Sequence, residues 1–345
     1  MTEVDNQNQG TFIPFLMRVK DGVAKEWGRT DSVASHPAEV KRAGERFDKG
    51  ILYYQKGAYQ PALMAFQEAL ELYQLSQHLS GQAKSWVGLG LTSYAMQDYR
   101  EAIAFSNHGL TVARTIGDSW TERQALSNLG NAYRHLAKYD RALDYKRQTL
   151  ELAQSLGDLP NQAAAWSNLG MLYKAMGEDR KAIDCYEHSL AIADQLGDRQ
   201  IERQVLQNLG NVHHKLGEHE HTINCYEKLL RLVRESGDQW AEMRILKSLG
   251  SAYYIVRNYA KSIAFHQKRL MLARALQEPN QEIQALGMLG TIHQAIGKYG
   301  EAMTYHEQQL GLAQKLNQLQ VVHKSRVSLK SLCCITGDFE RASQY

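Results

Sequence analysis

The sequence predicts an all-α protein built as a solenoid of stacked antiparallel helix pairs. The first observation is that a Leu-Gly pair recurs every 40 residues without insertion, and such a fixed period marks a repeat architecture. The second is that most units place an aromatic residue nine positions after the glycine and a small residue three positions further on. The Leu-Gly pairs begin at Leu89, Leu129, Leu169, Leu209, Leu249 and Leu289.

Each repeat has the pattern of two helices, as residues 120–157 illustrate. The first helix is expected from about Thr121 to His135, with apolar and small residues spaced along one face. A short break follows, and the second helix is expected to start near Asp140. Gly157 suits the position just after the end of that helix.

Small residues recur where the two helices of a pair are expected to touch, at Gly130 and Ala142 for example. A single pair cannot bury its own apolar face, so each pair must stack on its neighbours. The 40-residue period predicts seven complete units and a fragment that ends at Tyr345. An uncovered apolar face at that end raises self-association through the chain ends as one expectation.

The pattern resembles the tetratricopeptide repeat family. The residues that carry the resemblance are Trp166, Leu169, Gly170, Tyr173, Ala182 and Tyr186, in the order that the family shows. The longer period, with the stretches Asn128–Tyr133 and Tyr305–Ala313, is similar to the repeats of G-protein-signalling modulators and kinesin light chains. The resemblance implies a right-handed superhelix whose first helices line a concave groove, and in similar proteins that groove holds extended peptides.

The chain is expected to have three parts. Residues 1–10 are polar and are expected to form a disordered tail, and residues 37–345 form the solenoid. Between them, residues 11–36 contain an amphipathic segment and a linker. Three roles for this segment remain open: it caps the first repeat, it lies in a groove, or its residues 11–30 bind a membrane surface or a partner helix.

The bulk composition excludes several classes of function. A formal net charge of +3 is too small to indicate nucleic-acid binding. No apolar run approaches the roughly 20 residues that span a bilayer, and the N-terminus has no signal-peptide pattern, so a cytoplasmic protein is expected. No nucleotide-binding loop, zinc-protease motif, CxxC pair or nucleophile elbow occurs. The sequence therefore predicts a protein that is not an enzyme and has no cofactor.

A second stripe on the first helices is polar, and it supplies the predicted peptide-binding residues. Asn128, Asn168 and Asn208 recur at one position in three successive units. An asparagine amide can pair with both the C=O and the N–H of an extended backbone. The alternative is that these amides bond between adjacent repeats. The other predicted groove residues are Gln124, Asn131, Arg134, Lys174, Gln204, Asn211, His214, Arg244, Lys247 and Tyr254.

Cations outnumber acidic residues beside this stripe, so an acidic segment of a partner protein is the expected ligand. The alternative is an ordinary solvated face. The flanking cations are Arg123, Arg134, Lys174, Arg203, Lys215, Arg244 and Lys247. The expected function is that of an adaptor. Two alternatives remain: an assembly factor for a multi-subunit complex, including a membrane-bound one, and a regulator that senses a peptide or metabolite.

The stretch from His213 to His221 has the composition of a metal site, with four histidines and two glutamates. In the repeat frame, His213 and His219 take positions that tyrosine holds in other units. His214 falls on the groove stripe, where it is a candidate pH-sensitive contact, and His221 falls on the outer side of the second helix. Because these side chains are expected to point in different directions, the sequence predicts no metal site here.

Overall fold

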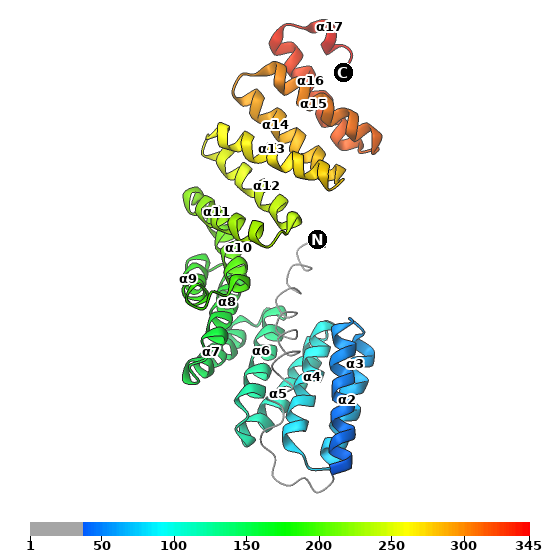
Figure 1. The fold of residues 1–345 in the computed structure, drawn as a ribbon, viewed down its shortest axis with the longest axis vertical. Helices are drawn as coiled ribbons and strands as arrows, with labels where there is room; N and C mark the ends of the chain where they lie inside the picture. Colours follow the sequence, from blue (N-terminus) through cyan, green and yellow to red (C-terminus); the bar gives the residue numbers. More distant parts are fainter. Residues whose placement is uncertain (1–36) are drawn as a thin grey trace. The chain divides into compact units, whose positions relative to one another are not determined.

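The computed structural model describes residues 37–345, and every regular element in that range is an α-helix (Figure 1). The all-α prediction is therefore confirmed for this part of the chain. The described residues form two compact units that divide between Gly177 and Glu178. The predicted tail, amphipathic segment and linker, residues 1–36, lie outside the described residues.

The first unit consists of seven helices among the described residues, and consecutive helices pack against each other. The first helices of neighbouring pairs are also in contact, α2 with α4 and α4 with α6, as stacking of repeats requires. The helices are α2 (Pro37–Gln55), α3 (Tyr59–Leu75), α4 (Leu79–Ala95), α5 (Tyr99–Ile116), α6 (Ser119–His135), α7 (Tyr139–Ser155) and α8 (Leu159–Met176).

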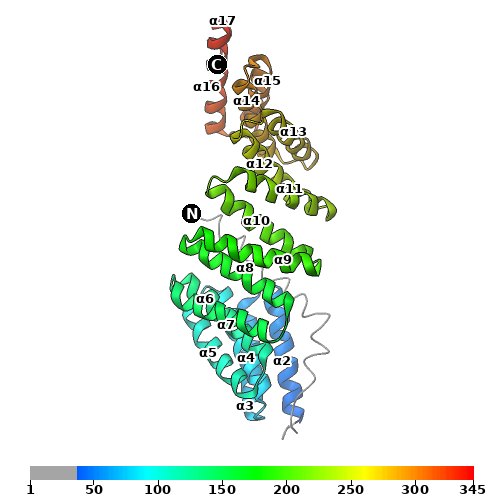
Figure 2. The ribbon, with the colours of Figure 1, turned by 90° about the vertical axis from the view of Figure 1, so that its left-hand side faces the viewer.

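The second unit begins with a single helix and continues as helix pairs, which Figure 2 shows as successive layers. Its last pair is incomplete, because α17 has only 4 residues. The helices are α9 (Asp179–Leu196), α10 (Arg199–Lys215), α11 (His219–Glu235), α12 (Gln239–Ile255), α13 (Tyr259–Ala275), α14 (Pro279–Ala295), α15 (Tyr299–Lys315), α16 (Leu319–Thr336) and α17 (Phe339–Ala342).

Local sequence explains why the helices start and stop in register. Many helices begin after an aspartate or asparagine whose side chain accepts a hydrogen bond from a backbone N–H of the first turn, which satisfies a donor that the helix itself leaves open. Gly157, expected just beyond the end of α7, has a φ of 63°, a conformation that glycine adopts without strain. The capping residues are Asp98, Asp118, Asp158, Asp198, Asp238, Asn258 and Asp338.

The repeated glycines mark the closest approach of the two helices in a pair. A Cβ added to Gly210 would lie 2.8 Å from Cε1 of Tyr226, and one added to Gly250 would lie 2.5 Å from Nε2 of His266. The side chain packed on the glycine comes from the second helix, 16 residues later in the sequence. We call this position the glycine-facing slot.

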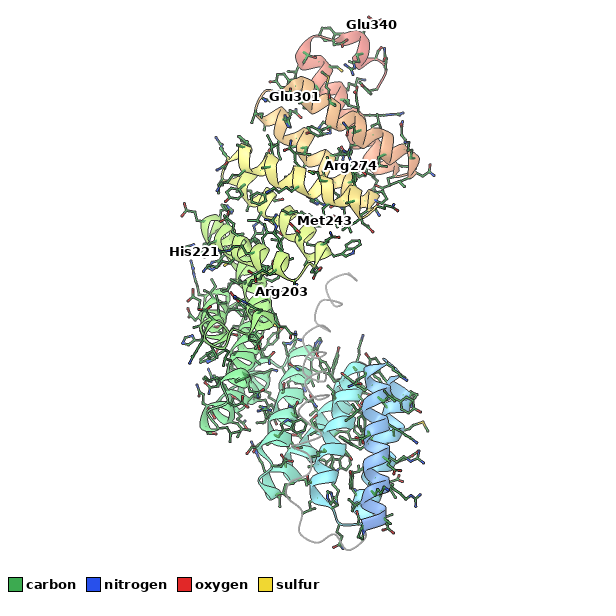
Figure 3. All side chains as sticks on the ribbon, viewed as in Figure 1. Arg203, His221, Met243, Arg274, Glu301 and Glu340 are labelled. Carbon is green, nitrogen blue, oxygen red and sulfur yellow. The ribbon has the colours of Figure 1, made fainter. Side chains whose placement is uncertain are left out.

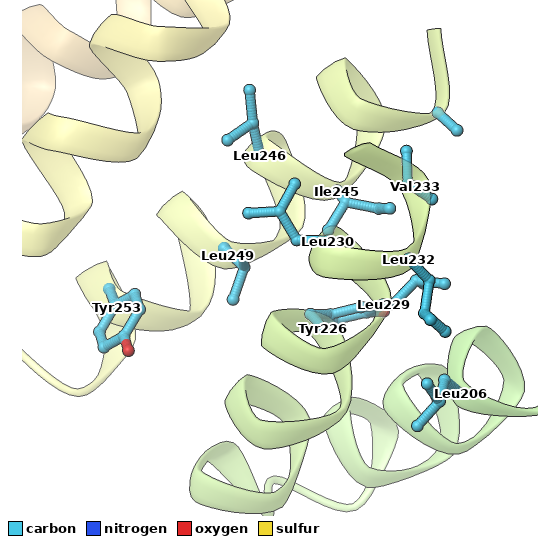
Figure 4. Packing of buried hydrophobic residues seen from close by; sticks show 11 residues of the cluster. Leu206, Tyr226, Leu229, Leu230, Leu232, Val233, Ile245, Leu246, Leu249 and Tyr253 are labelled. Atoms are coloured by element: carbon cyan, nitrogen blue, oxygen red, sulfur yellow. The ribbon is translucent and has the colours of Figure 1, made fainter. Parts of the chain in front are cut away.

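Apolar side chains fill the space between consecutive helices. In the second unit, Tyr226 and Leu230 of α11 face Ile245, Leu246 and Leu249 of α12, as Figure 4 shows. Burying one such leucine contributes about 1.5–3 kcal/mol, so stability comes mainly from this stacking. Between Pro37 and Tyr345, no helix combines the length and apolar character that crossing a bilayer requires.

Candidate functional site

In the first unit, the predicted stripe on α6 is largely buried. Gln124, Asn128 and Asn131 are 9%, 3% and 6% exposed. The Asn128 amide Nδ2 donates a hydrogen bond of 3.3 Å to the carbonyl oxygen of Val87 on α4. This bond between adjacent repeats is the alternative to ligand binding, because it engages one amide N–H and the side chain is buried. The buried amides of Asn128 and Asn131 therefore form hydrogen bonds to other residues of the first unit.

Asn131 instead accepts a hydrogen bond from a buried lysine of the glycine-facing slot. Nζ of Lys146, on α7, lies 2.6 Å from Oδ1 of Asn131 and 3.4 Å from the carbonyl oxygen of Ser127. Burial, together with the smaller effect of the charge of Arg134, lowers the pKa of Lys146 to about 7. The floor of this stripe therefore contains a lysine whose hydrogen-bond partners are neutral oxygens.

The remaining predicted residues of the first unit are half-buried. The Arg134 guanidinium lies on α6 with one nitrogen 2.8 Å from Nε2 of His135. Asn168 and Lys174 lie on α8. The Asn168 side chain makes no hydrogen bond to any residue between 37 and 345, so within the described chain its amide remains available.

In the second unit, the stripe on α10 is more accessible. Gln204, Asn208 and Asn211 are half-buried, and His214 is exposed. Asn211 accepts hydrogen bonds from the Tyr226 hydroxyl at 2.7 Å and from Nε2 of Gln207 at 3.2 Å. Asn208 makes no side-chain hydrogen bond within the described part of the chain, so it is the α10 asparagine that can still pair with a peptide backbone.

On α12 the stripe presents two exposed cations. Arg244 and Lys247 make no ion pair with any residue that the structure describes. Tyr254, near the end of the helix, is half-buried and packs against Tyr259 with ring centroids 5.7 Å apart. The cations therefore face solvent without an acidic partner from the described chain.

A buried arginine adds positive charge close to this surface. Arg269, on α13, is 1% exposed, and its NH2 group donates to Oε1 of Gln281 at 2.7 Å and to Oε1 of Gln284 at 2.8 Å. Burial lowers its pKa to about 10. His266, also on α13, has its pKa lowered to about 4 by burial and by the charges of Arg269 and Lys247. Arg269 and Lys247 therefore both lie close enough to His266 to disfavour its protonation.

The buried polar residues of the glycine-facing slot were not predicted, although the 40-residue repeat identifies their positions. Position 16 after a repeat glycine packs between two helices, so an apolar residue is expected there. A polar or ionisable residue at this position is the sequence feature that could have identified them. Such residues include Lys146 on α7, Tyr226 on α11, His266 on α13 and His306 on α15, and all four are buried.

Three of the flanking cations are neutralised, so the predicted excess of positive charge is smaller than the sequence suggests. The Arg123 guanidinium lies 2.9 Å from Oδ2 of Asp158, and Arg203 lies 3.2 Å from Oδ2 of Asp238. Both aspartates cap the first helix of the next repeat. Nζ of Lys215 lies 2.6 Å from Oδ2 of Asp179. The carboxylates come from neighbouring elements, which a count along one stripe leaves out.

The prediction that the histidines of residues 213–221 diverge is wrong for one pair. His213 is buried, as expected, but His221 stacks on it with ring centroids 5.0 Å apart. The turn after α10 reverses the chain, so the first turn of α11 lies beside the last turn of α10. Glu218 lies beside the buried ring, with Oε2 at 2.6 Å from Nδ1 of His213.

A cleft of about 520 Å³ lies elsewhere in the second unit, between α9, α10 and α11. Cations and carboxylates alternate along its walls, and Arg199 pairs with Glu202 at 2.8 Å. Such a mixed lining gives no preference for one sign of charge, unlike the surface of α12.

Comparisons with known proteins agree with the repeat architecture. A tetratricopeptide repeat family model matches residues 81–155, 121–195, 160–235 and 201–275, and a second model of the same description matches residues 285–320. Together these matches cover more than half of the chain. No curated protein matches the sequence.

Solved structures of other proteins have a similar fold. A signal transduction ATPase with numerous domains, with a tetratricopeptide repeat sensor, from Pyrococcus horikoshii has a TM-score of 0.62 and 16% identity. The match covers 99% of this chain and 52% of that one, so this chain spans about half of that protein. The apo form of the quorum sensor NprR from B. thuringiensis has a TM-score of 0.56 and 14% identity, over 99% of this chain and 97% of that one.

A Rap protein complexed with Competence and Sporulation Factor has a TM-score of 0.51 and 15% identity, over 89% of this chain and 81% of that one. At these identities the structural similarities concern the fold. The family matches, the 40-residue period and the stacked helix pairs agree with one another. This chain belongs to the tetratricopeptide repeat family.

Proposed function

We propose that this chain is a non-enzymatic interaction scaffold whose second unit binds an extended acidic segment of a partner protein along α10 and α12. The names of two similar structures, a quorum sensor and a Rap protein complexed with Competence and Sporulation Factor, support a role in binding a partner or ligand. They do not bear on which ligand this chain selects, which depends on its own residues.

The observation that carries the proposal is positive charge without carboxylate partners in the described chain. Arg244 and Lys247 are exposed on α12, and the buried Arg269 hydrogen-bonds only to glutamine oxygens. A carboxylate that approaches α12 gains attraction from all three charges. Burial of Arg269 strengthens this effect, because the field of a buried charge is screened less by water.

Asn208 on α10 supplies the backbone contact in this proposal. Its half-buried amide can donate to a peptide carbonyl and accept from a peptide N–H. Acidic side chains of the same segment would then contact Arg244 and Lys247. Ordering an extended segment costs conformational entropy, so we expect an affinity in the micromolar range, about −8 kcal/mol.

The test uses a peptide array with ten-residue sequences in matched acidic, amide and basic versions. The full chain is expected to bind acidic versions, and fluorescence anisotropy then measures the Kd of the strongest acidic peptide. Replacing Arg244 and Lys247 together by glutamine is expected to weaken binding at least tenfold, and Asn208→Ala at least threefold.

A matched control removes two positive charges elsewhere in the second unit. Lys268 on α13 and Lys315 on α15 are exposed, so their double replacement by glutamine has the same net charge as the α12 variant. This control is expected to change the Kd less than twofold. Equal binding of acidic and basic peptides, or equal loss in both double variants, would contradict the proposal.

A further inference from the structure

Two imidazoles and a carboxylate converge at the turn between α10 and α11 in the second unit. His213 lies in the last turn of α10, Glu218 immediately precedes α11, and His221 lies in the first turn of α11. One ligand atom from each residue lies within 4.8 Å of the other two. Among the residues that the structure describes, these three are the group of histidine, cysteine or acidic side chains whose ligand atoms lie close enough together to hold a metal ion.

The arrangement of the rings is compatible with one shared ion. The centroids of His213 and His221 lie 5.0 Å apart, with 23° between the ring planes. Two imidazoles on one tetrahedral zinc ion have centroids about 5 Å apart, because each nitrogen lies ~2.0–2.1 Å from the metal. In a tetrahedral site the donor atoms lie about 3.3 Å from one another. Nδ1 of His213 and Oε2 of Glu218, now 2.6 Å apart, would separate slightly, and the exposed His221 side chain can adjust to meet the same ion.

Glu218 is already oriented toward the rings. Its Oε1 atom lies 2.5 Å from the Arg180 guanidinium, and its Oε2 atom lies 2.6 Å from Nδ1 of His213. Arg180 therefore holds one carboxylate oxygen and leaves the other toward the histidines. His213 is buried whereas His221 lies at the surface of the unit (Figure 3), so an ion can enter from solvent and keep water as a fourth ligand.

The turn between the two helices of a pair, which we call the corner, has different residues in other repeats. The comparison shows which side chains are particular to the repeat of His213. Arg141 donates to the Tyr133 hydroxyl at 3.2 Å, and Lys261 donates to the Tyr253 hydroxyl at 3.0 Å. Each of these corners packs a cation on a tyrosine ring. At His213 and His221 both members of the pair are replaced by imidazoles, which are common metal ligands, and a carboxylate stands where one of the others has Asn258.

We propose that His213, Glu218 and His221 bind one Zn²⁺ ion, which ties the end of α10 to the start of α11. Two histidines with one glutamate form a ligand set that suits zinc in proteins. The ion would compensate for the loss of the tyrosine–cation contact in this repeat. His213, Glu218 and His221 are distinct from the proposed peptide-binding residues Asn208, Arg244 and Lys247, so the zinc site does not depend on the proposed function.

The test titrates the untagged full chain with zinc chloride in a calorimeter. We expect one zinc ion per chain and an increase in the melting temperature that a chelator reverses. With Co²⁺ as the probe, visible absorption bands typical of tetrahedral coordination are expected. His221→Ala, which changes an exposed side chain, is expected to weaken zinc binding at least tenfold.

Two variants separate this site from non-specific binding by histidines. His214→Ala removes the neighbouring exposed imidazole and is expected to leave the zinc affinity within twofold. The triple variant His213→Tyr, Glu218→Asn and His221→Lys reproduces the corner of Tyr253, Asn258 and Lys261, so it is expected to fold and to bind no zinc at the site. Circular dichroism checks that both variants keep the helical content of the parent.

Three results would overturn the proposal. The first is that the parent chain binds no zinc. The second is equal zinc affinity in His221→Ala and in His214→Ala. The third is that the folded triple variant keeps a site of the original affinity, since none of its three ligands would remain.

Discussion

Oδ1 of Asn131 accepts a hydrogen bond of 2.6 Å from Nζ of Lys146, a lysine that is 2% exposed. No carboxylate of the described chain forms an ion pair with this lysine. Transfer of a charged ammonium group from water to such a site is costly, which is why the lysine loses its proton near neutral pH. The pair links the first and second helices of one repeat and makes the stability of the first unit depend on pH.

Lys146 is expected to make the protein more stable as pH rises above neutrality. The unfolded chain keeps this proton to about pH 10.4, whereas the native lysine has a pKa of about 7. Between these values the unfolded state binds more protons, so the free energy of unfolding rises with pH by at most about 1.4 kcal/mol per unit. Below the native pKa the full cost of the buried charge remains.

The measurement is urea unfolding at pH 6.5, 7.5 and 8.5 for the parent and for Lys146→Met. The methionine variant lacks the titrating group and should show a flatter dependence, with its largest advantage at pH 6.5. Parallel curves for the two proteins would show that Lys146 does not carry the effect.

The same substitution is expected to have opposite effects at two glycines. In Gly210→Ala the new Cβ meets the buried Tyr226 ring at 2.8 Å, so we expect a loss of about 1–3 kcal/mol. In Gly311→Ala, within α15, the Cβ meets nothing within 4 Å, so we expect a gain of about 0.5–1 kcal/mol. Chemical denaturation measures both. A loss at Gly311 as large as that at Gly210 would refute the steric explanation.

Ala137 is expected to be a site where glycine stabilises the protein. It stands in the turn after α6 with a φ of 55°, a left-handed conformation that costs a residue with a Cβ about 1–2 kcal/mol. Part of this strain is offset by the greater freedom of glycine in the unfolded chain, so Ala137→Gly should gain about 0.5–1 kcal/mol. Thermal unfolding provides the measurement.

Gly57, at the same position two repeats earlier, provides the reverse experiment. Its φ is 73° and a Cβ there would meet nothing within 4 Å, so Gly57→Ala isolates the conformational cost. A loss of about 0.5–1 kcal/mol is expected. If both substitutions shift the melting temperature in the same direction, backbone strain is not the cause.

Two asparagines at equivalent positions are expected to differ in their contribution to stability. Asn128 is buried and bonds to Val87 of the preceding repeat, so Asn128→Ala should cost about 1–2 kcal/mol. Asn208 is half-buried without such a bond in the described chain, so Asn208→Ala should change stability by less than about 0.5 kcal/mol. Equal losses measured by denaturant unfolding would mean that the bond from Asn128 contributes little.

Much of the fold was predictable because its determinants are local and repeat in register. The helix expected from Thr121 to His135 is α6, Ser119–His135, and the helix expected near Asp140 is α7, Tyr139–Ser155. Small residues every 40 positions indicate where helices cross, and turn residues indicate where they end. Neither inference requires knowledge of a distant contact.

The surface was predicted less well, because its partners come from other repeats. Arg123 and Asp158 are 35 residues apart in the sequence, and Asn128 and Val87 are 41 residues apart. A count of charges and amides along one helix includes neither partner. Arg244 and Lys247 are exposed on α12, whereas Arg269, which comes from the following helix, is buried.

The sequence by itself determined the period, the helix pairs and the position of each residue within its repeat, since these depend on spacing along one chain. Only the tertiary structure decided which polar groups already have a hydrogen-bond or ion-pair partner and which remain available to a ligand, since that depends on contacts between repeats. The histidines of residues 213–221 illustrate the difference. The repeat frame assigned His213 and His221 to different faces of different helices, whereas the reversal at the turn between α10 and α11 placed their rings 5.0 Å apart beside one carboxylate.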